Sequence, residues 1–259
     1  MSLDMLSACG WPLPGINVTG SHTNPPKVTL VQEQFGVDGS FLLANMLVNH
    51  LKANTQANSV LLIATHHTSA HYAGVCKKLA FNTEAAVKNH QLTMVDVLEH
   101  LYSQGGTTGA LNLLQHIGQQ MKEARQAHPS NLLVIVDDLT FYAVMHPSGA
   151  ENPVIDFFDE QLSMASPSRP DHIVLKVNAS ECYGRLCAYL RDQAEVVVTL
   201  EPLSSGNFRE VDGRFTVHRR ERTATSQLEL LEHHRTLLYK VGERQIRTYV
   251  PGELGIKNL

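Results

Sequence analysis

The sequence has few cysteines, the residues that build disulfide and cysteine–zinc scaffolds. Its four cysteines, Cys9, Cys76, Cys182 and Cys187, show no C-x-x-C spacing, which argues against a disulfide framework or a cysteine zinc site. No apolar run approaches eighteen residues, so we expect no membrane span. Residues 1–26 have neither a basic start nor a long apolar stretch, so we do not expect secretion. Together these absences predict an intracellular protein.

The sequence also lacks a surplus of positive charge. Its formal net charge is −4, which excludes a globally basic nucleic-acid binder but leaves room for a local basic face. The formal net charge is +3 over residues 206–259 and −7 over residues 1–205. At 259 residues and 43% apolar content, the chain is long enough to bury a substantial core.

Short apolar runs alternate with amphipathic segments of about 10–15 residues, a pattern typical of βαβ crossovers. We therefore predict an α/β fold, with a mainly parallel twisted sheet, helices on both faces, and antiparallel edge strands at the C-terminal end. Residues 27–259 are expected to form a single domain, and residues 1–26, rich in proline and glycine, an extended and partly mobile lead-in. The expected strands span 27–31, 60–64, 92–97, 132–136, 173–177, 196–200, 213–220 and 236–249, the last broken at Gly242-Glu243 in the manner of a hairpin. The expected helices span 40–53, 70–79, 110–126, 153–162 and 181–191.

A glycine-bearing turn after the first expected strand resembles a phosphate-binding loop that has lost its key cation. A P-loop reads Gly-x-x-x-x-Gly-Lys-Ser/Thr, because backbone N–H groups cradle the phosphates and the lysine reaches the β and γ oxygens. With Gly39 as the second glycine, Ser40 stands at the lysine position and Phe41 at the magnesium-binding hydroxyl. Asp38 places a repelling carboxylate beside the cradle. The turn thus supplies four residues of a degenerate nucleotide pocket: Gly36, Asp38, Gly39 and Ser40.

The apolar run over residues 132–136 ends in Asp137 and Asp138, which we assign to the same pocket. In nucleotide-binding α/β proteins an acid at this point orients magnesium. The alternative is that two acids end a buried strand at the solvent boundary. Without the lysine, we expect no catalytic residues and no independent ATP hydrolysis by this chain.

Other residue groups carry weaker signals. His66, His67 and His71 lack an obvious fourth zinc ligand, and a strand end followed by a helix cap explains them equally well, so we predict no metal site and no bound cofactor. There is no Gly-x-Ser-x-Gly elbow for acyl transfer.

Arginines gather toward the C-terminal end of the chain. Guanidinium groups bind phosphate in a bidentate manner, which favours RNA or an acidic partner. The alternative is ordinary surface pairing with acids interleaved among them, such as Glu210. The candidate RNA-binding residues are Arg209, Arg214, Arg219 and Arg220.

With these residues in view, the chain resembles the sixth subunit of the Elongator complex. The matching segments are Asp38-Gly39-Ser40-Phe41-Leu42-Leu43, Leu51-Lys52-Ala53-Asn54, Ser69-Ala70-His71-Tyr72 with Lys78-Leu79, and the stretch from Leu133 to Leu139. The resemblance implies a RecA-like fold, a hetero-hexameric ring with two related RecA-like subunits, contact with the remaining Elongator complex, and tRNA binding in support of wobble-uridine modification. It also implies a cytoplasmic location, with the nucleus as a second one.

Two other functions stay open at this point. One is an active nucleotide hydrolase in which Arg185 or Lys176 replaces the missing lysine. The other is a scaffold with no RNA contact.

Overall fold

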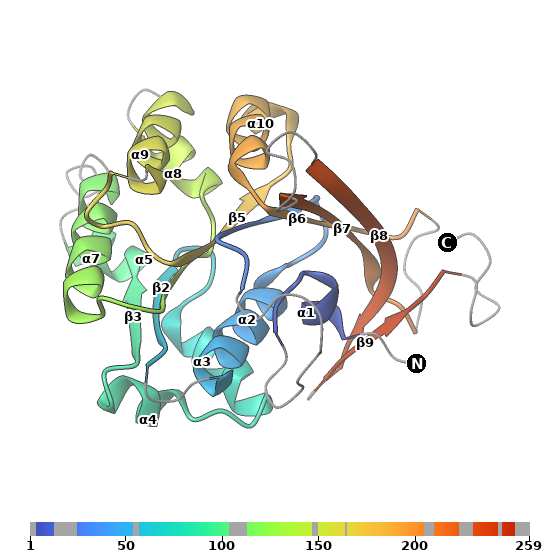
Figure 1. Cartoon of the computed structure of the whole chain (residues 1–259), viewed down its shortest axis with the longest axis horizontal. Helices are drawn as coiled ribbons and strands as arrows, with labels where there is room; N and C mark the ends of the chain where they lie inside the picture. The colour runs from blue at the N-terminus through green and yellow to red at the C-terminus, as the bar shows by residue number, and fades with distance from the viewer. Residues whose placement is uncertain are drawn as a thin grey trace.

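The structure is a computed structural model of the whole chain (Figure 1). It describes residues 4–12, 25–53, 57–103, 113–146, 150–163, 165–204, 210–222, 230–242 and 245–251.

One nine-stranded sheet, in the order β3-β2-β4-β5-β1-β6-β7-β8-β9, runs through the described residues. The pairs from β3 to β6 are parallel, and those from β6 to β9 are antiparallel. This confirms the predicted fold class. The strands are β1 (Val28–Glu33), β2 (Ser59–Ala64), β3 (Leu92–Asp96), β4 (Leu132–Val136), β5 (His172–Asn178), β6 (Val196–Glu201), β7 (Gly213–Arg222), β8 (Leu230–Val241) and β9 (Ile246–Tyr249).

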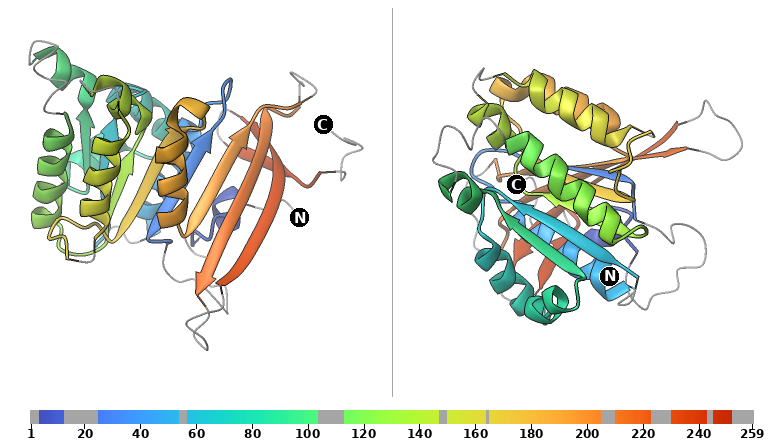
Figure 2. Two further views of the ribbon diagram at one scale, coloured as in Figure 1. Left: turned by 90° about the horizontal axis from the view of Figure 1, so that it is seen from above. Right: turned by 90° about the vertical axis from the view of Figure 1, so that its left-hand side faces the viewer.

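Helices cover both faces of the parallel part of the sheet, as Figures 1 and 2 show. One face packs against α1 (Met5–Ala8), α2 (Ser40–Ala53), α3 (Ser69–Lys78) and α4 (Thr83–Lys88). The other packs against α5 (Val97–Ser103), α7 (Leu113–Ala127), α8 (Thr140–Met145), α9 (Asn152–Leu162) and α10 (Gly184–Gln193), the last preceded by the 3₁₀ turn η1 (Glu181–Tyr183). Within the described residues, no helix is both long and apolar enough to cross a bilayer.

Alternation along the strands divides the interior into two cores. On β4, Leu133 and Ile135 face the core shared with α2, whereas Leu132 and Val134 face the core shared with α7 and α9. A strand buried on both faces reads as a continuous apolar run, which is why β4 was readable from the sequence.

Several elements differ from the sequence prediction. The lead-in expected to be extended contains α1, whose first turn is capped by Asp4, and Trp11 just after it is buried. The helices α4, α5 and α8 were missed because six or seven residues are too few to display a helical period. Strand β8 begins at Leu230, earlier than the expected start at residue 236. The predicted loop over 105–109 lies outside the described residues.

Candidate functional site

Three charged side chains meet at the carboxyl edge of the sheet. Glu33 ends β1, Lys176 lies near the end of β5, and Asp137 directly follows β4. These strands are neighbours in the order β4-β5-β1. By strand alternation, Glu33 and Lys176 lie on the α2 face, as do Val31 and Val174. The parallel topology therefore brings distant residues to one point beside the N-terminus of α2.

These three residues form a buried ionic triad. Lys176 is 0% exposed and donates to both carboxylate oxygens of Glu33, at 3.0 and 3.1 Å. Its Nζ lies 3.4 Å from Oδ1 of Asp137. Burial alone would lower the pKa of Lys176, but Asp137 and Glu33 raise it above its usual value, so the ammonium stays charged. Burial raises the pKa of Glu33, and the Lys176 ammonium and the Gly39 N–H oppose that rise.

The backbone donors at the start of α2 are already bound to carboxylates. The Gly39 N–H donates to Oε2 of Glu33 at 2.8 Å, and the Ser40 N–H donates to Oδ1 of Asp38 at 2.9 Å. The Ser40 hydroxyl donates to Oδ2 of Asp38 at 2.8 Å. In a P-loop, N–H groups at this place bind phosphate oxygens. Here the chain's own carboxylates occupy these two positions of the cradle.

Asp38 lies at the mouth of the site, with 48% of its side chain exposed. Its Oδ2 is 3.0 Å from Nε2 of His67. Burial would raise the pKa of Asp38, but the hydrogen bonds from Ser40 and the nearby His67 hold it below its usual value. The His67 ring stacks on His71, with ring centroids 4.0 Å apart.

The segment with His66, His67 and His71 connects β2 to α3, in agreement with the interpretation as a strand end followed by a helix cap. The side chain of Thr68 accepts from the His71 N–H and caps α3. In the described ranges, no group of three or more His, Cys, Asp or Glu side chains is arranged to hold a metal ion.

The two acids after β4 have different environments. Oδ2 of Asp137 accepts the N–H groups of His66 and His67 at 3.1 and 2.9 Å. Asp138 accepts the backbone N–H of Thr140 at 2.9 Å, together with the Thr140 hydroxyl, and the Asn178 amide at 3.3 Å. Burial raises the pKa of Asp138, and Thr140 opposes the rise. Asp138 thus orders the start of α8, while Asp137 belongs to the triad.

The charge balance of this site is unfavourable for phosphate. One ammonium, Lys176, faces the carboxylates of Glu33 and Asp137, and backbone N–H groups stabilise the excess negative charge. A bound phosphate would add a further anion close to the same cation and to Asp38. The arrangement holds the β1–α2 loop in place without a ligand.

The sequence placed six residues in one pocket: Gly36, Asp38, Gly39, Ser40, Asp137 and Asp138. The structure brings Asp38, Gly39, Ser40 and Asp137 together, whereas Asp138 bonds to Thr140 at the start of α8. Glu33 was missed, and Lys176 was named only as a substitute for the P-loop lysine. The signal was present, because a lysine inside the apolar run Ile173–Val177 requires a buried partner of opposite charge.

Two other residues that the sequence suggested lie apart from the triad: Gly36, predicted for the pocket, and Arg185, a candidate replacement for the missing lysine. Gly36 is on the outer part of the loop, with a φ of +89° and open space where a Cβ would be. Arg185, the other candidate for the missing cation, is exposed in the first turn of α10.

The candidate RNA-binding arginines are not gathered on one surface. Arg219 lies on the same face of β7 as Phe215, the face toward α2. Its guanidinium packs against Gly10. Arg220 points to the opposite face, where its Nη1 donates to the carbonyls of Arg191 and Asp192, both at 3.2 Å. Arg214 shares that face but lies six residues away, roughly 20 Å along the strand. Arg209 lies outside the described residues. tRNA contact by any of them stays a prediction.

Known proteins resemble the chain in sequence and in fold. No family model matches the sequence. Elongator complex protein 6 of Drosophila melanogaster is 25% identical over 268 residues, which cover 99% of this chain and 100% of that protein.

Solved structures share the fold at low sequence identity. A KaiC-like protein of Pyrococcus horikoshii has a TM-score of 0.58 and 12% identity, covering 92% of this chain and 96% of its own. The flagellar accessory protein FlaH of Methanocaldococcus jannaschii has a TM-score of 0.58 and 13% identity, covering 87% and 91%. An uncharacterized Pyrococcus horikoshii protein, solved with an unknown peptide, has a TM-score of 0.60 and 11% identity, covering 87% and 92%. The chain is thus similar over nearly its whole length to Elongator complex protein 6 and has a RecA-like fold, and the resemblance predicted from its sequence is confirmed.

Proposed function

We propose that this chain is a non-catalytic subunit of an Elongator complex and supports tRNA wobble-uridine modification through assembly. The observation that supports this most strongly is made in the β1–α2 loop. Glu33 and Asp38 there accept hydrogen bonds from N–H groups that would bind phosphate in a P-loop. The whole-length similarity to Elongator complex protein 6 supports the choice of complex.

The expected partners are two related RecA-like Elongator subunits in a hetero-hexameric ring, then the remaining Elongator complex and tRNA. If this subunit binds no nucleotide, its β1–α2 loop has to keep its shape by the chain's own contacts. The buried triad supplies that rigidity, because Lys176 is fixed between β1 and β4 by two carboxylates. We expect the chain to act in the cytoplasm, and also in the nucleus.

The assembly is tested by co-expressing the full chain with the two related RecA-like subunits and measuring the native mass of the product. We expect one complex with six subunits and equal amounts of the three chains. A chain that stays monomeric beside both partners would contradict the proposal.

RNA contact is tested on that complex by measuring tRNA affinity over a salt series. Reversing Arg214 to Glu should weaken binding and reduce the slope of log affinity against log salt by about 1 if this side chain contacts a phosphate. Arg220 is less suitable, because its substitution also removes contacts with α10. Unchanged affinity and slope would remove Arg214 from the tRNA surface.

A further inference from the structure

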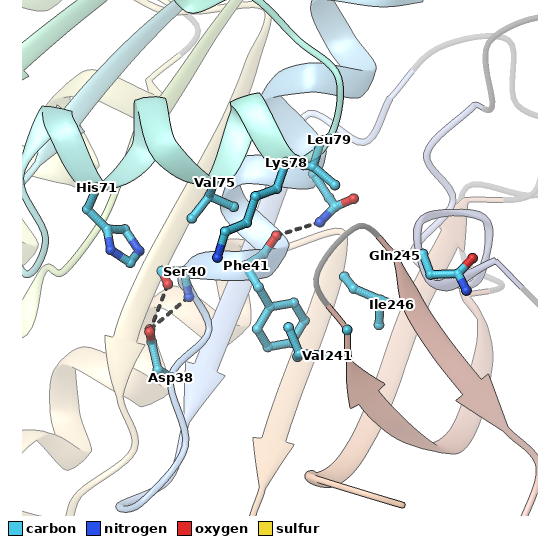
Figure 3. Close-up of a pocket in the computed structure, with 12 residues that line it drawn as sticks. Asp38, Ser40, Phe41, His71, Val75, Lys78, Leu79, Val241, Gln245 and Ile246 are labelled. Atoms are coloured by element: carbon cyan, nitrogen blue, oxygen red, sulfur yellow. Dashed lines mark hydrogen bonds between the residues drawn. The ribbon is translucent and has the colours of Figure 1, made fainter.

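A cavity of about 320 Å³ lies between α2, α3 and the turn that joins β8 to β9. Its volume is at the lower end of the range for small-molecule sites, which is about 300–1,000 Å³. Helix α3 lines the cavity with His71, Val75 and Lys78, which are four and three residues apart and therefore share one face of the helix. Figure 3 shows these side chains along one side of the cavity.

Most of the wall is apolar, and it comes from both the helices and the C-terminal strands. Its apolar side chains are Phe41, Val75, Leu79, Val241 and Ile246. The Phe41 ring also packs against Tyr239 of β8, with ring centroids 5.3 Å apart, so this wall is continuous with the core. An apolar group bound in the cavity would contact helices on one side and strands on the other, and it would leave water.

The cavity has one positive charge, on Lys78. Side chains of a helix lean toward its N-terminus, and Figure 3 shows the Lys78 side chain running back along α3 with its ammonium toward Ser40. No described residue forms a hydrogen bond or an ion pair with Lys78. Burial, and then the neighbouring His67, lower the pKa of His71, so that its ring is neutral at pH 7. Among the described lining residues, only Lys78 is therefore positive at this pH.

The surrounding chain offers no anion to pair with Lys78. The sequence contains no Asp or Glu from Gly39 to Thr83, the segment that forms α2, β2 and α3. Asp38 also lines the cavity, but its two oxygens accept from Ser40, and one of them lies 3.0 Å from the His67 ring. The Lys78 ammonium thus lies beside a mainly apolar wall without a counter-ion. An anionic group bound there would gain a charge-assisted hydrogen bond.

These surroundings favour a single negative charge over a phosphate. A phosphate group carries up to two charges at pH 7 and needs several donors. The N–H groups at the start of α2 are already bound to Glu33 and Asp38, so one compact ammonium remains. A second negative charge in the cavity would also be repelled by Asp38. The lining therefore matches a monocarboxylate with an apolar body better than a nucleotide or an RNA backbone.

We propose that this cavity binds a small amphipathic carboxylic acid. Its carboxylate pairs with the Lys78 ammonium, and its apolar body packs between Phe41 and Val75 on one side and Val241 and Ile246 on the other. The ligand thereby joins the helical layer to the C-terminal strands. This inference goes beyond the proposed function and depends neither on assembly with partner subunits nor on tRNA.

The test uses octanoate as the probe and 1-octanol as the uncharged compound of the same chain length. Each is titrated by calorimetry into the isolated full chain, as the wild type, Lys78→Met and Lys77→Met. Lys77 is the matched control, because it is exposed, also lies at the end of α3 and does not line the cavity. We expect stoichiometric octanoate binding that Lys78→Met weakens at least about fivefold and Lys77→Met leaves unchanged, since only Lys78 holds the carboxylate. The affinity for 1-octanol should not fall in either variant.

A further variant tests the location of the ligand. Val75→Phe fills part of the cavity and should abolish binding of both probes, with the melting temperature of the free chain as the check on folding. If this variant is unstable, the two lysine variants decide by themselves. Several results would overturn the proposal: no saturable octanoate binding, equal affinity of the wild type for octanoate and 1-octanol, the same loss in both lysine variants, or unchanged binding in a folded Val75→Phe.

Discussion

The β1–α2 loop and strand β7 were the two regions in which the sequence predicted function, and the fold treats them in opposite ways. Around the loop, Glu33, Asp137 and Lys176 from three strands converge on one buried point. Along β7, Arg219 and Arg220 are adjacent in sequence yet project to opposite faces of the sheet. Parallel strands gather residues at their carboxyl ends, whereas alternation along one strand separates them.

The largest expected effect comes from removing the cation of the triad. Lys176→Met leaves two buried carboxylates without their ammonium, and breaking a buried ion pair in this way costs about 3–5 kcal/mol. Denaturant unfolding should show this loss. The matched change in the C-terminal region is Lys240→Met, which removes a partly exposed pair with Asp212 and should cost about 1 kcal/mol or less. Equal losses in the two variants would contradict the difference between the two regions.

The second-largest expected effect is a loss of stability at acidic pH that comes from His50 and not from the triad. His50 lies at the opposite, amino-terminal edge of the sheet, with its ring 3.0 Å from the Asn131 carbonyl. Burial lowers the pKa of His50 from 6.5 to about 4. Between these pH values the unfolded chain binds the proton and the folded chain does not, so the free energy of unfolding falls as the pH drops.

The free energy of unfolding that the change in the His50 pKa removes below pH 4 is about 3 kcal/mol, because each pKa unit corresponds to about 1.4 kcal/mol. Unfolding curves at a series of pH values should show that His50→Gln flattens the decline between pH 6.5 and 4. The control is His66→Gln, which changes an exposed histidine. An identical decline in the wild type and His50→Gln would show that other groups cause the acid sensitivity.

A smaller effect tests how tightly the loop is packed. A Cβ on Gly39 would lie 3.0 Å from Leu200 Cδ1 and 3.3 Å from Oε2 of Glu33. Gly39→Ala should therefore disturb the carboxylate that binds its own N–H and destabilise the fold by about 1–3 kcal/mol. The comparison is Gly36→Ala, where the space is open and the cost is the positive φ alone, about 1 kcal/mol. Thermal unfolding distinguishes the two, and a milder effect at Gly39 would contradict the packing argument.

The smallest effect concerns β7. Arg220→Ala removes two hydrogen bonds to the carbonyls that end α10 and should cost about 1 kcal/mol or less. Hydrogen exchange should show faster exchange in the last turn of α10, including the Ala194 N–H, which donates to Leu190. Arg214→Ala, on the same face at the other end of β7, should leave that turn unchanged. Unchanged exchange in Arg220→Ala would remove the capping role.

The sequence was sufficient for the α/β fold, the antiparallel edge and the location of the loop, because buried strands read as apolar runs. It was not sufficient for the triad. Glu33 and Lys176 are 143 positions apart, and only the strand order places β5 beside β1. A lysine within an apolar strand indicated that a partner existed, but not which one.

The same limit applies to the cavity and to the arginines. Lys78 was visible in the sequence, but the cavity that it lines forms only where the fold brings α2 and α3 against the turn after β8. The arginines were close together in the sequence, but successive side chains of a strand point to opposite faces, so closeness in sequence did not place them on one surface.

The most direct test is a calorimetric titration of the isolated full chain with Mg²⁺–ATP, followed by a phosphate-release assay on the same sample. Since carboxylates already occupy part of the cradle and Lys176 is held by two of them, we predict no binding heat at millimolar nucleotide and no phosphate release. Stoichiometric binding with turnover, lost in Asp137→Ala, would show that the loop still serves a nucleotide.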